Sequence, residues 1–280
     1  MGDKREVDVV VLSDIHLGTF GCHANELLRY LKSIRPKKVI LNGDIIDIWN
    51  FKKRYFPKSH MKVIKHFIHL AQKGVEVYYI TGNHDELFRR FADSDLGSIH
   101  LRNHLHLEIG GKQTWIFHGD IFDASIQSAK WLAKLGGWSY DLLIWINHHM
   151  NRLLNALGRE KYSLSKAIKD GVKKAIKYIG DFELAAAEMA AKQGFHQVIC
   201  GHIHQPQIRT IHTAYGSIDY MNSGDWIENL TALEWDGNTW TQYCYERVGE
   251  EWDEGDNKLD ASPKELLTQL LYESIYGSEA

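Results

Sequence analysis

The sequence predicts an α/β protein in which two β-sheets pack together, and three features of its pattern support this prediction. As far as about residue 95, short apolar runs that suit buried strands alternate with amphipathic stretches that suit helices. From residue 121 to about residue 194 the pattern is entirely helical. Short β-rich runs then occupy 206–213, 218–222, 228–235 and 239–246, which is consistent with a second sheet stacked on the first.

The first of these features predicts parallel strands. The predicted strands are 7–12, 38–41 and 77–80, and the predicted helices between them are 25–33 and 60–72. Pro36 after the first helix and Gly74 after the second are residue types that commonly stop a helix. An order of strand, helix, strand, helix, strand implies a parallel core with right-handed connections.

The remaining segments predict paired strands, an insertion and a tail. Leucines at 101–107 and the apolar run 114–117 flank Gly110-Gly111, which predicts two strands around a turn. The helical stretch 121–194 then interrupts the order as an insertion, or lid. We therefore predict one domain over residues 1–250 that includes this insertion, followed by an acidic C-terminal tail at 251–280.

The composition is that of an ordinary globular protein. With 280 residues, 44% of them hydrophobic and 25% charged, the chain is long enough to bury a full core. A formal net charge of −3 gives no general attraction to nucleic acid, so no nucleic acid partner is predicted. The three cysteines form no CxxC motif, which suits a reducing compartment and argues against a thiolate metal site. Because no apolar signal segment or membrane-spanning run is found, a cytoplasmic location is expected.

Polar loops follow five of the apolar runs in the same register. They are Ser13-Asp14-Ile15-His16, Asn42-Gly43-Asp44, Gly82-Asn83-His84-Asp85, His118-Gly119-Asp120 and Gly201-His202-Ile203-His204. Asp, His and Asn offer nitrogen and oxygen donors that suit Mn²⁺, Fe²⁺, Zn²⁺ or Mg²⁺. Each loop alone is a weak signal, but five of them together predict a metal site. Asp44 is the candidate for the carboxylate that two ions share.

The order and spacing of these loops resemble those of the calcineurin-like metallophosphoesterase superfamily, from about residue 8 to residue 226. The resemblance implies a four-layer α/β/β/α sandwich with two metals at the strand ends. It implies that Asp14, His16, Asp44 and His204 hold the first metal, and that Asp44, Asn83, His118 and His202 hold the second. His84 would contact the scissile phosphate and protonate or stabilise the leaving oxygen, and Asp85 would orient His84.

Other segments narrow the resemblance. Four features resemble the UDP-2,3-diacylglucosamine pyrophosphatase family of lipid A synthesis: the stretch 44–49, the insertion after His118-Gly119-Asp120, the stretch 201–206 and the stretch 222–226. The best-known branch of that family has arginine at the position of His84. This chain therefore resembles a second, related branch.

The residues also support phosphoester chemistry on their own terms. Two divalent ions with two carboxylates, Asp14 and Asp44, would leave about two positive charges to meet a phosphate or diphosphate. The ions would activate a water as the nucleophile, so no protein nucleophile is required. Ser13 is predicted to be a hydrogen-bonding residue of a loop. Asp47, Asp120 and Asp123 are candidates either for fixing ligand tautomers or for ordinary turn and cap roles.

The insertion is the predicted place of substrate choice. Candidate substrate-binding residues are Arg159, Ser165, Lys166, Lys169 and Lys173 in its basic second part, and Trp131, Trp138 and Trp145 in its apolar first part. The lysines recur at helical spacing, which suits either a solvated face or a row of cations for a nucleotide diphosphate. The tryptophans suit either an ordinary core or an apolar patch for acyl chains or a membrane surface.

We therefore predict a hydrolase with two divalent metal ions, Mn²⁺ in the first place and Fe²⁺, Zn²⁺ or Mg²⁺ as alternatives. The resemblance implies cleavage of UDP-2,3-diacylglucosamine to UMP and 2,3-diacylglucosamine 1-phosphate, with attack at the phosphorus nearer uridine. The enzyme would meet this nucleotide-diphosphate lipid peripherally, on the cytoplasmic face of the inner membrane. One alternative is a phosphodiesterase or phosphatase acting on another nucleotide or lipid phosphate. Another is a metal-binding scaffold with a vestigial site, against which the intact candidate ligands argue.

Overall fold

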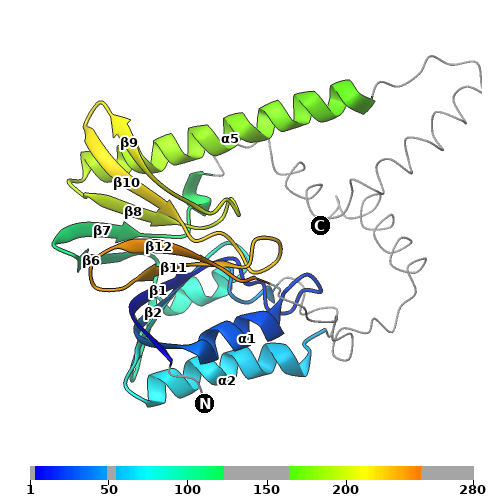
Figure 1. Ribbon diagram of the computed structural model, residues 1–280, viewed down its shortest axis with the longest axis vertical. Coiled ribbons are helices and arrows are strands. Elements are labelled where there is room, and N and C mark those ends of the chain that lie inside the picture. The colour runs from blue at the N-terminus through cyan, green and yellow to red at the C-terminus, as the bar shows by residue number, and fades with distance from the viewer. Residues whose placement is uncertain (1–3, 49–54, 123–163, 247–280) are drawn as a thin grey trace, which may run out of the picture.

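The computed structural model describes residues 4–48, 55–122 and 164–246, and it confirms the predicted α/β/β/α sandwich (Figure 1). The helices are α1 (Ala24–Ser33), α2 (Lys58–Gln72) and α5 (Leu164–Lys192), with short 3-10 helices at Glu86–Phe91 and Asp120–Phe122. The strands are β1 (Arg5–Leu12), β2 (Ile34–Asn42), β3 (Glu76–Ile80), β4 (Asp95–Leu96), β5 (Ile99–Arg102), β6 (Leu105–Ile109), β7 (Lys112–Ile116), β8 (Gln197–Cys200), β9 (Gln207–Thr213), β10 (Gly216–Asn222), β11 (Thr231–Trp235) and β12 (Trp240–Cys244).

The first sheet has seven strands in the order β12-β11-β1-β2-β3-β5-β4. Strands β1, β2, β3 and β5 are parallel to one another, as the alternation of strands and helices predicts. Side chains of β1 alternate between the two faces of the sheet. Val10 and Leu12 pack in the core under α1 and α2, whereas Val9 and Val11 pack in the core between the sheets. Burial on both faces explains why this strand reads as a continuous apolar run.

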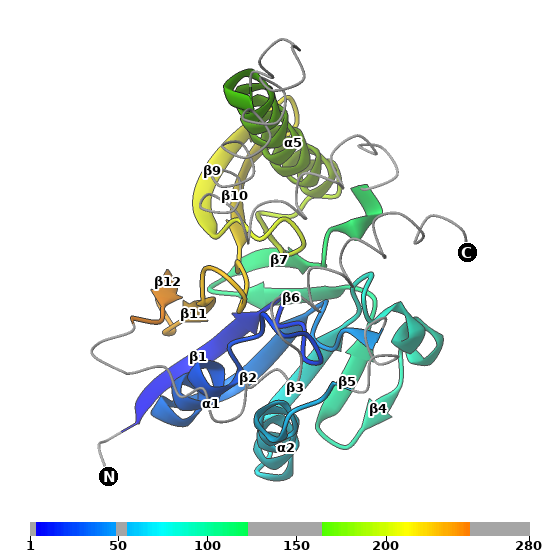
Figure 2. The ribbon, with the colours of Figure 1, turned by 90° about the vertical axis from the view of Figure 1, so that its right-hand side faces the viewer.

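The second sheet has five strands in the order β6-β7-β8-β10-β9. Trp115 and Phe117 point from the β7 segment to the side covered by α5, while Ile116 points to the first sheet. Figure 2 shows α1 and α2 on the outer side of the seven-stranded sheet and α5 on the outer side of the five-stranded sheet. The two sheets thus share one core, and each has a helical layer of its own.

Three details differ from the sequence predictions. Strands β11 and β12, predicted in the second sheet, instead extend the first sheet, where β11 pairs antiparallel with β1. Leu101 belongs to β5 of the first sheet and not to the hairpin of β6 and β7. Pro36 lies inside β2, which begins at Ile34 directly after α1. A proline is tolerated near the start of a strand, where one missing N–H costs little of the ladder.

Helix α5 is one continuous helix whose two halves have different surroundings. Its C-terminal half packs on the second sheet through Phe182, Ala186, Ala187 and Ala190, all fully buried. Its N-terminal half extends past the edge of that sheet, where Ile176 is 64% exposed (Figure 1). The C-terminal part of the predicted insertion is therefore the outer layer of the fold. Residues 123–163 of the insertion and the predicted tail at 251–280 lie outside the described residues. Within the described ranges, no helix combines the length and apolarity needed to cross a membrane.

Candidate metal centre

Five loops that follow β1, β2, β3, β7 and β8 meet at one end of the two sheets. We call the segments 13–16, 42–44, 82–85, 118–120 and 201–204 the site loops. The carboxyl ends of parallel strands meet at the same edge of a sheet, which is where such folds commonly bind ligands. Backbone hydrogen bonds fasten the first two loops together, from Asp14 N to Gly43 O at 3.1 Å and from His16 N to Asp44 O at 2.9 Å.

The site loops bring the candidate ligands together in adjoining groups. One group is Asp14, His16 and His204, a second is Asp44, His118 and His202, and a third is His16, Asp44 and His84. Asp44 Oδ2 lies 3.3 Å from His118 Nε2 and 3.8 Å from His16 Nε2, so one oxygen faces both sides of the centre. Asp14 Oδ1 lies 3.2 Å from His204 Nε2. These separations are those expected of ligands that surround a common ion.

One imidazole ring of the centre has a hydrogen-bond acceptor behind it, and two others have a carboxylate nearby. His118 Nδ1 lies 2.9 Å from the carbonyl oxygen of Asn42, so its N–H donates there and leaves Nε2 as the ligand atom facing Asp44. Carboxylates occupy the corresponding place behind two other rings. Asp47 Oδ2 is 3.8 Å from His16 Nδ1, and Asp225 Oδ2 is 3.9 Å from His204 Nδ1. Such partners commonly fix the tautomer of a metal-binding histidine.

Several atoms that face the centre are buried without a hydrogen-bond partner among the described residues. They are Asp14 Oδ1, His16 Nε2, Asn83 Oδ1 and His118 Nε2. A buried polar atom with no partner is costly and calls for an explanation. Carboxylate, imidazole and amide donors without thiolate suit Mn²⁺, Fe²⁺, Zn²⁺ or Mg²⁺. The residues present therefore fit a pair of divalent ions.

The electrostatics of the group are those of a site built for cations. Burial alone would raise the pKa of Asp14, but His204 and His118 beside it lower that pKa to about 2. Burial would lower the pKa of His118, but Asp44 raises it to about 10. The carboxylates are thus ionised and draw positive charge toward them.

The backbone of the site loops is strained, as is common at functional sites. Five candidate ligands, none of them glycine, have positive φ: Asp14, His16, Asp44, His202 and His204, with values of 51°, 52°, 54°, 69° and 53°. The loops also approach one another too closely for a side chain at certain glycines. A Cβ at Gly82 would lie 2.2 Å from Asp44 Oδ1, and one at Gly201 would lie 2.7 Å from Asp14 Oδ2. Glycine is needed there because the carboxylates of neighbouring loops occupy the space.

His84 and Asp85 lie in the same loop but face different surroundings. The backbone N–H of His84 donates to Asp44 Oδ1 at 2.8 Å, and its ring Nδ1 is 3.3 Å from Asp47 Oδ2. Asp85 is fully buried and accepts hydrogen bonds from Gly82 N, Ile45 N and the Tyr79 hydroxyl. The family resemblance implied that Asp85 would orient His84. The carboxylate against the His84 ring is instead that of Asp47, and the bonds of Asp85 hold the loop itself.

Other predicted residues fall in varied places. Ser13 forms hydrogen bonds to the loop after β10, with the Ser223 hydroxyl at 2.7 Å and with Gly224 O at 2.9 Å. It is thus a loop hydrogen-bonding residue, as predicted. Asp120 forms an ion pair with Arg89. Lys173 is exposed on α5, whereas Ser165, Lys166 and Lys169 belong to α5 with side chains that are not described. Asp123, Trp131, Trp138, Trp145 and Arg159 lie outside the described residues.

One residue that the sequence analysis did not select is Asp225. It is fully buried in the loop after β10, and its Oδ1 accepts from the backbone N–H groups of Ile227 and Glu228. Its other oxygen lies behind His204. A signal was available, because Gly224-Asp225 follows an apolar strand in the way that Gly43-Asp44 does. This signal was missed because the loop contains no histidine beside the Gly-Asp pair.

An α/β/β/α sandwich whose strand ends gather two adjoining groups of carboxylates and imidazoles defines a metallophosphoesterase. Comparison with known families agrees, since residues 7–206 match the family model described as Calcineurin-like phosphoesterase. The chain belongs to the calcineurin-like phosphoesterase family and is a phosphoester or diphosphate hydrolase.

Curated relatives are similar over most of the chain. The UDP-2,3-diacylglucosamine hydrolase of Aliivibrio fischeri is 23% identical over 81% of this chain and 94% of its own length. Proteins of the same name from Blochmanniella pennsylvanica and Stenotrophomonas maltophilia are 27% and 24% identical, over 74% and 82% of this chain. These matches extend over 82% and 95% of the length of the two relatives, respectively. The similarity therefore extends well beyond the site loops.

Proposed function

We propose that this protein hydrolyses the diphosphate of UDP-2,3-diacylglucosamine, giving UMP and 2,3-diacylglucosamine 1-phosphate. The observation that carries the proposal is the set of three adjoining ligand groups, linked through His16 and Asp44, in a chain similar over 81% of its length to a hydrolase named for that substrate. A complete set of candidate ligands in close proximity also argues against a scaffold with a vestigial site.

The proposed ligands divide between two ions. Asp14, His16, Asp44 and His204 would hold the first ion, and Asp44, Asn83, His118 and His202 would hold the second. Support comes from the two faces of Asp44 Oδ2 and from the unpartnered oxygen of Asn83. Two divalent ions in these places would polarise the phosphate and activate the attacking water. Mn²⁺ is our first choice of metal because the donors are carboxylate, amide and imidazole.

Residues of the protein itself would hold the loop in place and protonate the leaving oxygen. His84, whose ring is held beside Asp47, is placed to donate a proton or hydrogen bond to the leaving oxygen. Burial would lower the pKa of His84, but the neighbouring Asp47 and Asp44 raise it. Asp85 would keep the loop in place through Gly82 and Ile45.

We further propose a peripheral position on the cytoplasmic face of the inner membrane. A diacylated substrate is held at a membrane surface, so an enzyme that acts on it has to meet that surface. The exposed Ile176 and the neighbouring Lys173 on α5 would suit such contact, since apolar and basic residues together favour anionic lipid. Sedimentation with vesicles of anionic and of neutral phospholipid tests this, and equal absence from both pellets would contradict it.

The decisive experiment measures hydrolysis of UDP-2,3-diacylglucosamine by the Mn²⁺-loaded protein. Water labelled with ¹⁸O shows which phosphorus is attacked, and we expect the label in UMP. Long-chain, short-chain and deacylated substrates are then compared by kcat/KM. Each buried methylene contributes about 0.8 kcal/mol, so loss of several carbons should lower kcat/KM by orders of magnitude. Equal values for all three would replace the lipid substrate with a soluble nucleotide phosphodiester.

A further inference from the structure

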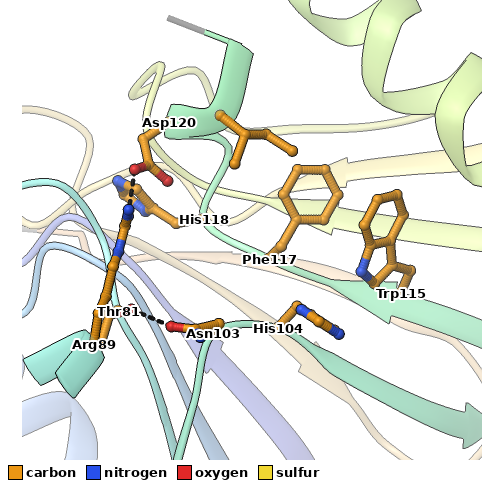
Figure 3. A pocket seen from close by; sticks show the side chains of 9 residues that line it. Thr81, Arg89, Asn103, His104, Trp115, Phe117, His118 and Asp120 are labelled. Carbon is orange, nitrogen blue, oxygen red and sulfur yellow. Dashed lines mark hydrogen bonds and ion pairs between the residues drawn. The ribbon is translucent and has the colours of Figure 1, made fainter. Parts of the chain in front are cut away.

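A cavity of about 240 Å³ opens beside the candidate metal centre on the side of the second ligand group (Figure 3). It is lined by residues from four segments: Thr81 and Arg89; Asn103 and His104; Trp115, Phe117 and His118; and Asp120 with Ile121. Its walls are largely aromatic and apolar, with polar groups at a few places. Of the residues that line it, only His118 has a role in the proposed mechanism.

One wall of the cavity contains a donor that lacks an acceptor. Trp115 is 7% exposed, and its Nε1 is buried without a hydrogen-bond partner among the described residues. In Figure 3 the nitrogen-bearing ring of Trp115 faces the space between Phe117 and His104. Burying an indole N–H without an acceptor is costly, so its presence at a cavity points to a ligand that supplies one.

The opposite wall connects the cavity to the candidate metal centre. The His118 ring lines the cavity, while its Nε2 faces Asp44. Arg89 and Asp120 form an ion pair beside His118, where Figure 3 shows both side chains on the same side of the cavity. A ligand in the cavity would therefore be continuous with a phosphate at the second ligand group.

Size and chemistry limit what the cavity can take. A volume of about 240 Å³ is that of roughly eight waters at about 30 Å³ each, more than a phosphate needs, and below the range of about 300–1,000 Å³ typical of drug-sized sites. Trp115 and Phe117, with ring centroids 4.3 Å apart and ring planes inclined at 35°, form an aromatic wall. The amide of Asn103 lies at the rim and accepts from the Thr81 hydroxyl at 3.3 Å. A flat ring with carbonyl acceptors and an N–H on its edge matches these groups.

We propose that this cavity binds the uracil ring of the substrate, with Trp115 Nε1–H donating to a uracil carbonyl and Asn103 pairing with the uracil edge. The inference rests on the proposed function, because it takes the substrate to be a uridine diphosphate. It assigns the nucleotide end of the substrate to the β7 side of the centre. The diacylglucosamine end then lies on the far side of the metals.

The test compares two probes that differ only in the base. UMP and ribose 5-phosphate each present one phosphate to the metals, so the ratio of their dissociation constants reports what the base contributes. Titration calorimetry on the Mn²⁺-loaded full chain should show UMP binding at least roughly tenfold more tightly, which is the effect of one buried hydrogen bond with its packing.

Two variants locate the contribution in the cavity. Trp115→Phe removes the N–H but keeps an aromatic ring against Phe195 and Phe117. This variant should weaken the binding of UMP about tenfold and leave the binding of ribose 5-phosphate unchanged. Asn103→Ala, at an exposed rim position, should act in the same direction with little risk to folding. The matched controls are Trp240→Phe on β12 and Asn238→Ala in an exposed turn, and neither should alter the ratio.

The outcomes separate this inference from the proposed function. Equal affinity for the two probes in the unmodified protein, or an unchanged ratio in both cavity variants, would overturn the uracil site even if UDP-2,3-diacylglucosamine is cleaved. Tight UMP binding that depends on Trp115 would uphold it even if the lipid substrate is not cleaved. Should Trp115→Phe lose its metal content, Asn103→Ala decides the question alone.

Discussion

The site loops and the N-terminal half of α5 lie in the same chain but differ in the exposure of their described side chains. Each site loop is fastened to its neighbours, as in the hydrogen bonds from His202 N to Asp14 Oδ2 at 2.9 Å and from His84 N to Asp44 Oδ1 at 2.8 Å. The N-terminal half of α5 extends past the sheet, and Lys173 and Ile176 are exposed. Among the described residues, one region is thus held by close contacts between loops, and the other presents exposed helical side chains.

The two regions need their side chains to be positioned with different accuracy. Chemistry at a pair of ions needs ligands held to within about an ångström, which strained loops on rigid strands can provide. Recognition of a long, flexible substrate tolerates an exposed helical surface. We therefore expect substitutions in the site loops to abolish activity and substitutions on α5 to change substrate affinity by small factors. The following predictions test that expectation in order of decreasing effect.

The largest effect is expected for Asp44→Ala. Asp44 Oδ2 faces ligands of both groups, so its loss should release both ions or nearly so. Activity should fall by at least roughly a thousandfold, because the ions supply several kcal/mol of transition-state stabilisation. Elemental analysis of the purified variant is the measurement. Two tightly bound metals per chain would contradict the shared position of Asp44.

The second effect is expected for His84→Ala. The variant should keep its metals but lose roughly a hundredfold in kcat, as the removal of a general acid or charge-stabilising donor typically does. The loss should shrink for a substrate with a p-nitrophenolate leaving group if His84 protonates the leaving oxygen. An unchanged rate on every substrate would remove His84 from the mechanism.

A third, smaller effect distinguishes two buried aspartates. Asp47→Asn should lower kcat by about tenfold to a hundredfold, because Asp47 lies behind both His84 and His16. Asp85→Asn should instead lower stability, since Asp85 accepts from Gly82, Ile45 and Tyr79. Metal content, kcat and the urea midpoint of both variants are measured together. A kcat loss in Asp85→Asn without loss of stability would return the orienting role to Asp85.

The same contrast explains how much of the molecule the sequence could predict. Parallel strands, paired strands at Gly110-Gly111 and the ligand loops were predicted because each leaves a local pattern: an apolar run, then a turn or a polar loop. The parallel order explains why the loops after β1, β2 and β3 meet, since strand ends at one edge of a sheet lie together, whereas the approach of the loops after β7 and β8 depends on how the two sheets pack. The family resemblance added an expectation of how the candidate ligands would divide between two ions.

What the sequence could not predict depends on contacts between distant residues. The return of β11 to the first sheet is a pairing of Val9 with Trp235, far apart in the chain. The place of Asp47 beside His84, rather than Asp85, depends on how two loops approach each other. The cavity at Trp115 arises where β3, β5, β6 and β7 segments converge, and no local pattern marks it.

The smallest effect is expected on α5, and it tests the second region directly. Lys173 lies on the exposed helix, where a single cation attracts a diphosphate through water and is screened by salt. Lys173→Ala should therefore raise KM by about two- to fivefold, the range of a single exposed charge interaction, without changing metal content or kcat. The effect should be larger at low ionic strength and vanish at high salt. Lys62→Ala, an exposed lysine of α2 on the other side of the fold, is the matched control. Equal KM values for the two variants at low salt would make the lysines of α5 an ordinary solvated face, and recognition of the diphosphate would then have to come from the site loops and the cavity beside them.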